Sequence, residues 1–152
     1  MTRTAHHVPT AAVDRGLLLM RIAFGTVFVA HGLQKLLGFG VAGTAGFLET
    51  LGIPFPGPNA VALIAVETVG GLALLAGFFT RTTGVLLAFA MLIAVVTVHL
   101  PNGYFLPNGV EFALTMLLGS LALTQTGPGR YSVDALGQDR VMTEPYPVRK
   151  AA

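Results

Sequence analysis

The stretch "LLLMRIAFGTVFVAHGLQKLL", residues 17–37, decides the fold class of this chain. It is long enough to cross a hydrocarbon core of about 30 Å, which takes about 20 apolar residues. Its apolar run is longer than that of a usual signal peptide and no small-residue cleavage site follows it cleanly, so we expect an uncleaved membrane anchor. Near its end it nevertheless carries His31, Gln34 and Lys35. The presence of these polar side chains in an apolar segment has to be explained.

The composition of the 152-residue chain favours one integral membrane domain. Hydrophobic residues make up 53% and charged residues 11%, and the mean hydropathy is +0.73, which is too apolar for an ordinary water-soluble domain of this length. The formal charge of +2 comes from scattered basic residues, so a nucleic-acid partner is not expected. The chain has no cysteine, which excludes disulfides, thiolate metal sites and thiol chemistry of its own.

Three further apolar segments follow the first one. Together they predict an all-α membrane protein, a four-transmembrane-helix bundle over residues 17–126, with spans at about 17–37, 60–79, 83–99 and 110–126. The connecting and terminal segments are polar or rich in glycine and proline, and we expect an N-terminal tail at 1–16, an interfacial loop at 38–59 and a weakly ordered C-terminal tail at 127–152.

The distribution of basic residues predicts the orientation of these spans. Outside the spans, lysine and arginine occur in the segment before the first span, in the loop between the second and third spans, and in the segment after the fourth span. The other two loops contain neither residue. Short cytoplasmic segments carry this excess of positive charge. We therefore expect a multi-pass protein of the plasma membrane with both termini in the cytoplasm.

With this orientation, ionisable side chains from all four spans fall in one outer layer of the membrane. At 1.5 Å per residue, His31 lies about 9 Å and Lys35 about 3 Å below the outer edge, and Glu67 lies about 10 Å deep. His99 ends the third span and Glu111 begins the fourth. Each charge in hydrocarbon costs about 2.5 to 3.5 kcal/mol unless it meets a partner or a wet cavity. We expect these five residues to line a polar pocket, with Glu67 paired to Lys35 or His31.

Several of these residues have structural alternatives. Lys35 could extend to the outer headgroups, His99 could be an interface residue, and Glu111 could be a first-turn acid favoured by the helix dipole. Arg21, one turn inside the cytoplasmic edge, is expected to extend to lipid phosphates and is left outside the pocket.

Glycines on the first two spans suggest close helix packing. Gly25 and Gly32 share a stripe of the first span, and Gly70, Gly71 and Gly77 lie near Glu67 on the second. Small residues let backbones approach in a membrane, so these glycines are expected to bring the two helices together.

Four blocks of the sequence resemble the DoxX family of small bacterial membrane proteins. They are "LLLMRIAFGTVFVAHGLQKL", "VETVGGLALLAGFFTR", "HLPNGYFLPNGVEFALTMLLGSLAL" and "GPGRYSVD", which together extend over about residues 15–137. The resemblance implies a four-helix membrane protein linked to oxidoreductase systems. Relatives act as a thiosulfate:quinone oxidoreductase subunit, or are associated with a sulfurtransferase and a superoxide dismutase. The resemblance brings no family-wide catalytic residue set.

Three functions of different classes remain open from the sequence. The first is a quinone-linked subunit or membrane anchor of an oxidoreductase system, in which Glu67 or His31 passes a proton. The second is a non-redox binder or carrier of a small amphiphilic molecule in the same pocket. The third is a haem protein with His31 and His99 as axial ligands, which an absorption spectrum would test. No metal site, covalently bound cofactor or autonomous catalytic centre is expected.

Overall fold

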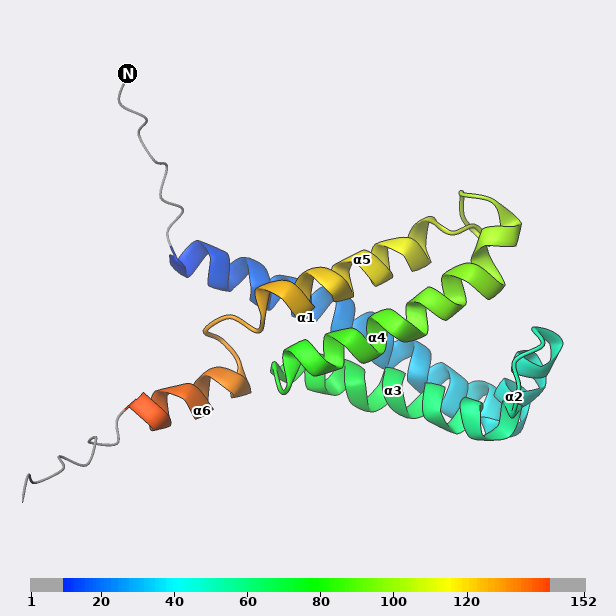
Figure 1. The fold of residues 1–152 in the computed structure, drawn as a ribbon, viewed down its shortest axis with the longest axis horizontal. Helices are drawn as coiled ribbons and strands as arrows, with labels where there is room; N and C mark the ends of the chain where they lie inside the picture. The colour runs from blue at the N-terminus through cyan, green and yellow to red at the C-terminus, as the bar shows by residue number, and fades with distance from the viewer. Residues whose placement is uncertain (1–9, 143–152) are drawn as a thin grey trace, which may run out of the picture.

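The computed structural model describes residues 10–142, and this part of the chain forms helices joined by turns, without a strand (Figure 1). The long helices are α1 (Thr10–Leu33), α3 (Pro56–Ala76), α4 (Thr80–Ala94) and α5 (Glu111–Thr126). The shorter elements are two π-helical stretches, η1 (Gln34–Phe39) and η2 (Val95–His99), the 3-10 turn η3 (Leu100–Asn102), α2 (Gly40–Thr50) and α6 (Val133–Met142).

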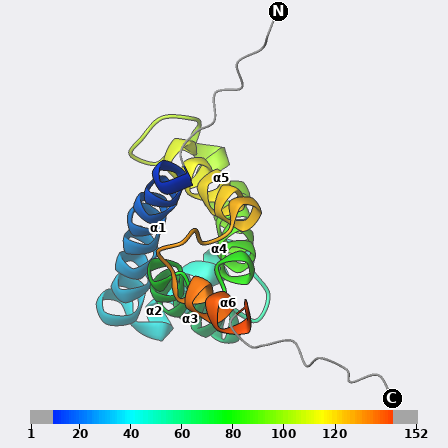
Figure 2. The same cartoon turned by 90° about the vertical axis from the view of Figure 1, so that its left-hand side faces the viewer.

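The four long helices pack lengthwise into a bundle. Neighbouring pairs are α1 with α3, α3 with α4, and α4 with α5, and α1 also contacts α5, as the end-on view in Figure 2 shows. Each helix contributes apolar side chains to one buried cluster, which consists of Phe28, Leu74, Leu87, Met116 and Leu123. The bundle is therefore held by a shared core.

Glycines set the close approach of α1 to α3. A Cβ atom on Gly32 would lie 2.7 Å from the backbone nitrogen of Thr68, and one on Gly71 would lie 2.8 Å from that of Val29. A Cβ on Gly25 would meet the carbonyl oxygen of Gly71 at 3.0 Å. The expected packing role is confirmed for these three glycines, because a larger residue there would force the two backbones apart, whereas Gly70 lies against Leu87 on α4 and Gly77 against Arg21 and Ser132.

The two ends of α3, and the turn that leads from it to α4, follow from the sequence. Pro56 stands in the first turn of α3, where its missing N–H costs no intrahelical hydrogen bond. Gly77 ends the helix in the left-handed conformation with a φ of 69°, and the Phe78 N–H donates to the Ala73 carbonyl. This is the pattern of a glycine-terminated helix. Phe79 is also left-handed, with a φ of 45°, and α4 begins directly after it.

Three helical stretches of the described chain are long and apolar enough to cross a membrane: residues 10–50, 56–76 and 80–102. Large apolar side chains are widely exposed on their outer faces, among them Leu19, Val69 and Phe89. An exposed apolar surface of this extent is typical of helices surrounded by lipid. Helix α5 has 16 residues, which corresponds to about 24 Å at 1.5 Å per residue.

Three expectations about the connecting segments are corrected. The N-terminal tail was expected over residues 1–16, but helix α1 already begins at Thr10; residues 1–9 lie outside the described part. The loop expected at 38–59 is helical as far as Thr50: η1 continues the first helix to Phe39, the chain changes direction at Gly40, whose φ is 67°, and α2 then extends to Thr50. The tail expected at 127–152 is ordered over residues 127–142 and packs back onto the bundle, and residues 143–152 lie outside the described part.

Candidate functional site

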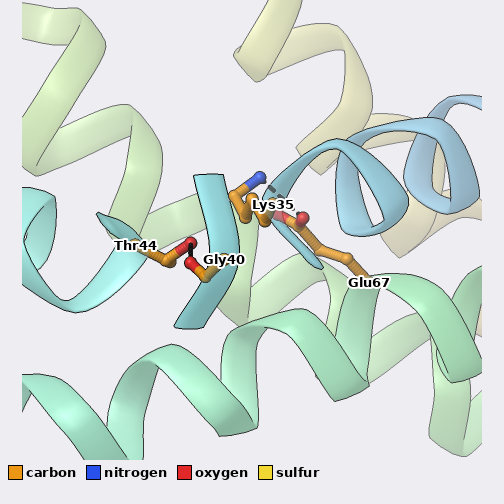
Figure 3. Close-up of polar contacts among 4 residues, drawn as sticks. All are labelled: Lys35, Gly40, Thr44 and Glu67. Carbon is orange, nitrogen blue, oxygen red and sulfur yellow. Dashed lines mark hydrogen bonds and ion pairs between the residues drawn. The ribbon is translucent and has the colours of Figure 1, made fainter. Parts of the chain in front are cut away.

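The candidate site is centred on an ion pair between Lys35 and Glu67. The Lys35 Nζ donates to the Glu67 Oε2 at 2.6 Å, and Figure 3 shows the two side chains pointing toward each other from neighbouring helices. The side chain of Glu67 is 8% exposed and that of Lys35 is 21% exposed. The pairing that the sequence predicts for Glu67 is therefore present, and its ammonium partner remains partly accessible.

Two local features bring this pair together. Gly32 allows α1 to approach α3 one turn before Lys35, so the lysine starts close to the face that carries Glu67. Lys35 then stands in the π-helical stretch η1, which widens the helix and changes the direction of the side chains that follow. Single π-helical turns of this kind occur frequently at functional sites.

Next to the pair, two polar groups complete the local surroundings. Thr44 on α2 donates its Oγ1 to the carbonyl of Gly40 at 2.9 Å, which satisfies the hydroxyl within its own helix (Figure 3). Thr68, next to Glu67 in the sequence, lies against Gly32 and has a buried Oγ1 without a hydrogen-bond partner. The site therefore contains one paired charge, and the Thr68 hydroxyl is buried in the contact between α1 and α3.

The other three predicted site residues occupy different positions. His31 is exposed, and its ring lies 6.3 Å from that of Phe112 on α5 in a tilted arrangement. His99 places its Nδ1 3.1 Å from the carbonyl of Asn108, and Glu111 accepts a hydrogen bond of 2.8 Å from the Leu106 N–H. The last two thus hold the turn between α4 and α5. Figure 1 places this turn at the same end of the bundle as α2 but apart from it.

The opposite end of the bundle contains a buried charge that the sequence analysis placed wrongly. Arg21 is 1% exposed, and its Nη2 donates to the carbonyl of Tyr131. The guanidinium lies directly against Gly77, where its Nη1 leaves no room for a Cβ atom. Arg21 therefore does not extend to lipid phosphates, because the chain's own C-terminal segment returns to cover it.

Asp134 completes this arrangement at the start of α4. Its carboxylate accepts hydrogen bonds from the N–H groups of Phe79 at 2.8 Å and Thr80 at 3.0 Å, and its own N–H donates to the Gly77 carbonyl at 3.0 Å. A carboxylate is favoured at a helix N-terminus, where free N–H groups and the dipole are positive. We call Arg21, Gly77, Tyr131 and Asp134 the C-terminal clamp.

The sequence held a signal for this clamp. An arginine inside an apolar span needs a polar partner, and "GPGRYSVD", residues 127–134, places a sharp turn and a carboxylate directly after the last long helix. These residues were expected to belong to a weakly ordered tail, so their structural role was not predicted.

Comparison with known proteins establishes the family. The DoxX family profile matches residues 16–100. The inner membrane protein YqjF of Escherichia coli (strain K12) is 38% identical over 125 residues, which cover 81% of this chain and 92% of the relative. This chain belongs to the DoxX family.

Two further DoxX relatives cover similar ranges. The Bacillus subtilis (strain 168) protein named "Putative oxidoreductase CatD" is 36% identical over 119 residues, 78% of this chain and 84% of the relative. The inner membrane protein YphA of Escherichia coli (strain K12) is 32% identical over 124 residues, 78% of this chain and 87% of the relative. No solved structure matches this DoxX chain significantly. With its long apolar helices, the chain is a multi-pass protein of the plasma membrane.

Proposed function

We propose that this DoxX-family protein is a quinone-linked subunit or membrane anchor of an oxidoreductase system, and that Lys35 and Glu67 bind the polar end of its ligand. The observation that supports this most is the ion pair of 2.6 Å, in which Lys35 keeps part of its side chain accessible. A purely structural bundle has little need for two charges among apolar helices, since each is costly there. A non-redox carrier of a small amphiphile would use the same two residues.

The side chains at the site suit a quinone. The Lys35 ammonium can donate to a carbonyl oxygen, and the Glu67 carboxylate can accept a proton. A bound quinone supplies reversible two-electron, two-proton chemistry. The role of the protein is then to orient the head group with Lys35, to hold a proton at Glu67, and to offer apolar helix faces to the tail.

A soluble partner belongs to this proposal, because the chain has no cysteine and needs an external electron donor. The relative named "Putative oxidoreductase CatD" supports an oxidoreductase setting. A sulfurtransferase or a superoxide dismutase is the partner class that the family resemblance suggests. Native mass spectrometry of gently solubilised protein would report the masses of ligand and partner together.

We further propose that α5 crosses the membrane, which gives four spans and two cytoplasmic termini. Figures 1 and 2 support this, because the start of α1 and the end of α6 lie at the same end of the bundle, as an even number of crossings requires. Tags placed at both termini should be inaccessible from outside intact cells. A terminus labelled from outside would rule out this topology.

Binding of a menaquinone analogue tests the function. The double variant Lys35→Met with Glu67→Leu removes both charges, so it should keep the helical circular dichroism spectrum and lose saturable binding. Glu49→Gln changes an exposed carboxylate on α2 and serves as the matched control, which should bind as wild type does. The proposal fails if the double variant binds normally, or if the wild-type protein shows no saturable binding.

A further inference from the structure

Beside the C-terminal clamp lies an exposed apolar surface that the proposed function does not use. It consists of aromatic and aliphatic side chains from the turn between α3 and α4 and from the start of α6: Phe78, Phe79, Tyr131, Val133 and Leu136, which we call the Phe78–Leu136 face. Phe79 is 64% and Leu136 is 65% exposed. In the described part of the chain, nothing covers these side chains.

The depth of this face in the membrane follows from the helices. Helix α3 has 21 residues, which is about 31 Å and matches the thickness of the hydrocarbon core. Phe78 and Phe79 follow directly and therefore stand at the edge of the hydrocarbon. The Asp134 N–H donates to the Gly77 carbonyl, which holds the start of α6 at the same level. Val133 and Leu136 thus reach the layer of lipid headgroups.

Two adjacent depressions give this face an amphiphilic character. An apolar one of about 440 Å³ is lined by Phe78, Val133, Leu136, Gly137 and Asp134. A second, of about 350 Å³, shares Asp134 and is lined also by Phe79, Thr80, Arg81, Thr82 and Pro128. Asp134 lines both depressions, and its carboxylate accepts hydrogen bonds from the N–H groups at the start of α4, while Arg81 gives the second depression a positive side chain.

Two exposed arginines lie on the segments next to the face: Arg81 lines the second depression, and Arg130 directly precedes Tyr131. Arg81 donates to the Thr124 carbonyl at 3.3 Å and lies against Gly127. Arg130 donates its backbone N–H to the Asp14 carboxylate at 3.0 Å, which places it beside Arg15 on α1. Guanidinium groups bind phosphate oxygens well, and basic residues close to a membrane attract anionic lipids.

We propose that the Phe78–Leu136 face is a binding site for an anionic phospholipid, with the phosphate at Arg81 and Arg130 and the apolar part of the lipid against Phe78, Val133 and Leu136. Charge, depth and the paired depressions all fit a lipid headgroup. A soluble protein docked on the same face is the competing occupant that the experiment must separate.

Because the natural chain has no cysteine, single positions can be labelled cleanly. A fluorophore on Leu136→Cys, in vesicles of phosphatidylcholine with phosphatidylglycerol, should be quenched by lipids that carry a nitroxide on the headgroup. The control is Ala11→Cys, about 15 Å further out along α1 than Arg21 at 1.5 Å per residue, and it should be quenched far less. An unquenched Leu136 position would overturn the proposal and leave the face to a protein partner.

The affinity for phosphatidylglycerol, measured by native mass spectrometry, tests the arginines separately. Arg81→Gln with Arg130→Gln should weaken binding about fivefold for each arginine removed. Arg81→Lys with Arg130→Lys keeps both charges and should retain most of the affinity, which separates the electrostatic effect from a folding defect. Equal affinity of the glutamine variant and the wild type would also overturn the proposal.

Discussion

The two ends of the bundle each accommodate a cationic side chain among apolar helices, and they do so in different ways. At one end, the charge of Lys35 is neutralised by Glu67 on the neighbouring helix, within the membrane-spanning part. At the other, Arg21 contacts no carboxylate of residues 10–142 directly: it donates to the Tyr131 carbonyl beside the C-terminus of α3, where the helix dipole is negative. The Lys35–Glu67 ion pair therefore stays partly accessible, so a ligand could use it. Arg21, by contrast, is buried beneath the C-terminal segment.

The largest loss of stability is expected when Glu67, the carboxylate that neutralises Lys35, is removed. Glu67→Leu leaves Lys35 unpaired and should lower the free energy of unfolding by about 3 kcal/mol, the lower end for broken buried pairs because Lys35 is partly exposed. Adding Lys35→Met should restore most of the loss. Unfolding in denaturing detergent, followed by circular dichroism, measures both. If the double variant is no more stable than Glu67→Leu, the pairing is not what stabilises this end.

The next largest loss of stability is expected at Gly32, the glycine that lets α1 approach α3 one turn before Lys35. Gly32→Ala forces a Cβ against the backbone of Thr68 and should cost about 1 to 3 kcal/mol, as overpacking usually does. Gly46→Ala on α2 is the control, since a Cβ there meets nothing within 4 Å. The same unfolding assay compares the two variants, and equal stabilities would contradict the close approach of α1 to α3.

A smaller effect is expected at the C-terminal clamp. Asp134→Ala removes the carboxylate from the start of α4 and should cost about 1 kcal/mol, the usual loss for a helix cap. It should also speed tryptic cleavage after Arg130, because the segment loses its attachment to the turn between α3 and α4. Asp134→Asn can still accept one of the two hydrogen bonds and should fall between wild type and alanine. Unchanged cleavage in Asp134→Ala would show that the cap does not hold the segment.

The smallest change in stability is expected for Glu111, a carboxylate at the same end of the molecule as Glu67. Glu111 accepts one hydrogen bond from Leu106 in an exposed turn, and glutamine offers an equivalent oxygen. Glu111→Gln should therefore change the stability by less than about 0.5 kcal/mol. Glu67→Gln should cost distinctly more, because it removes the charge that neutralises Lys35. Similar losses in the two variants would contradict the distinction between an ion pair and a turn contact.

Hydropathy and charge in the sequence predict the four long helices and a pairing of Glu67 with Lys35 or His31, because the cost of an isolated charge in hydrocarbon leaves few arrangements open. Shared depth alone could not place His99 and Glu111, since depth along a helix does not say which side of the bundle a residue occupies. The clamp was missed for a related reason. The partner of Arg21 is a backbone carbonyl, which every residue has, so the residue types at 127–134 indicate a turn and a carboxylate but not which residue Arg21 contacts.

The contact between Arg21 and Tyr131 also has a consequence for biogenesis. It joins residues 110 positions apart, and at a synthesis rate of about 5 to 20 residues per second, roughly 5 to 20 s separate their appearance at the ribosome. During this interval α1 is available for insertion while Arg21 lacks its partner, and the flexible side chain can reach water or lipid phosphates. The finished chain closes this end of the bundle last, when residues 127–134 arrive.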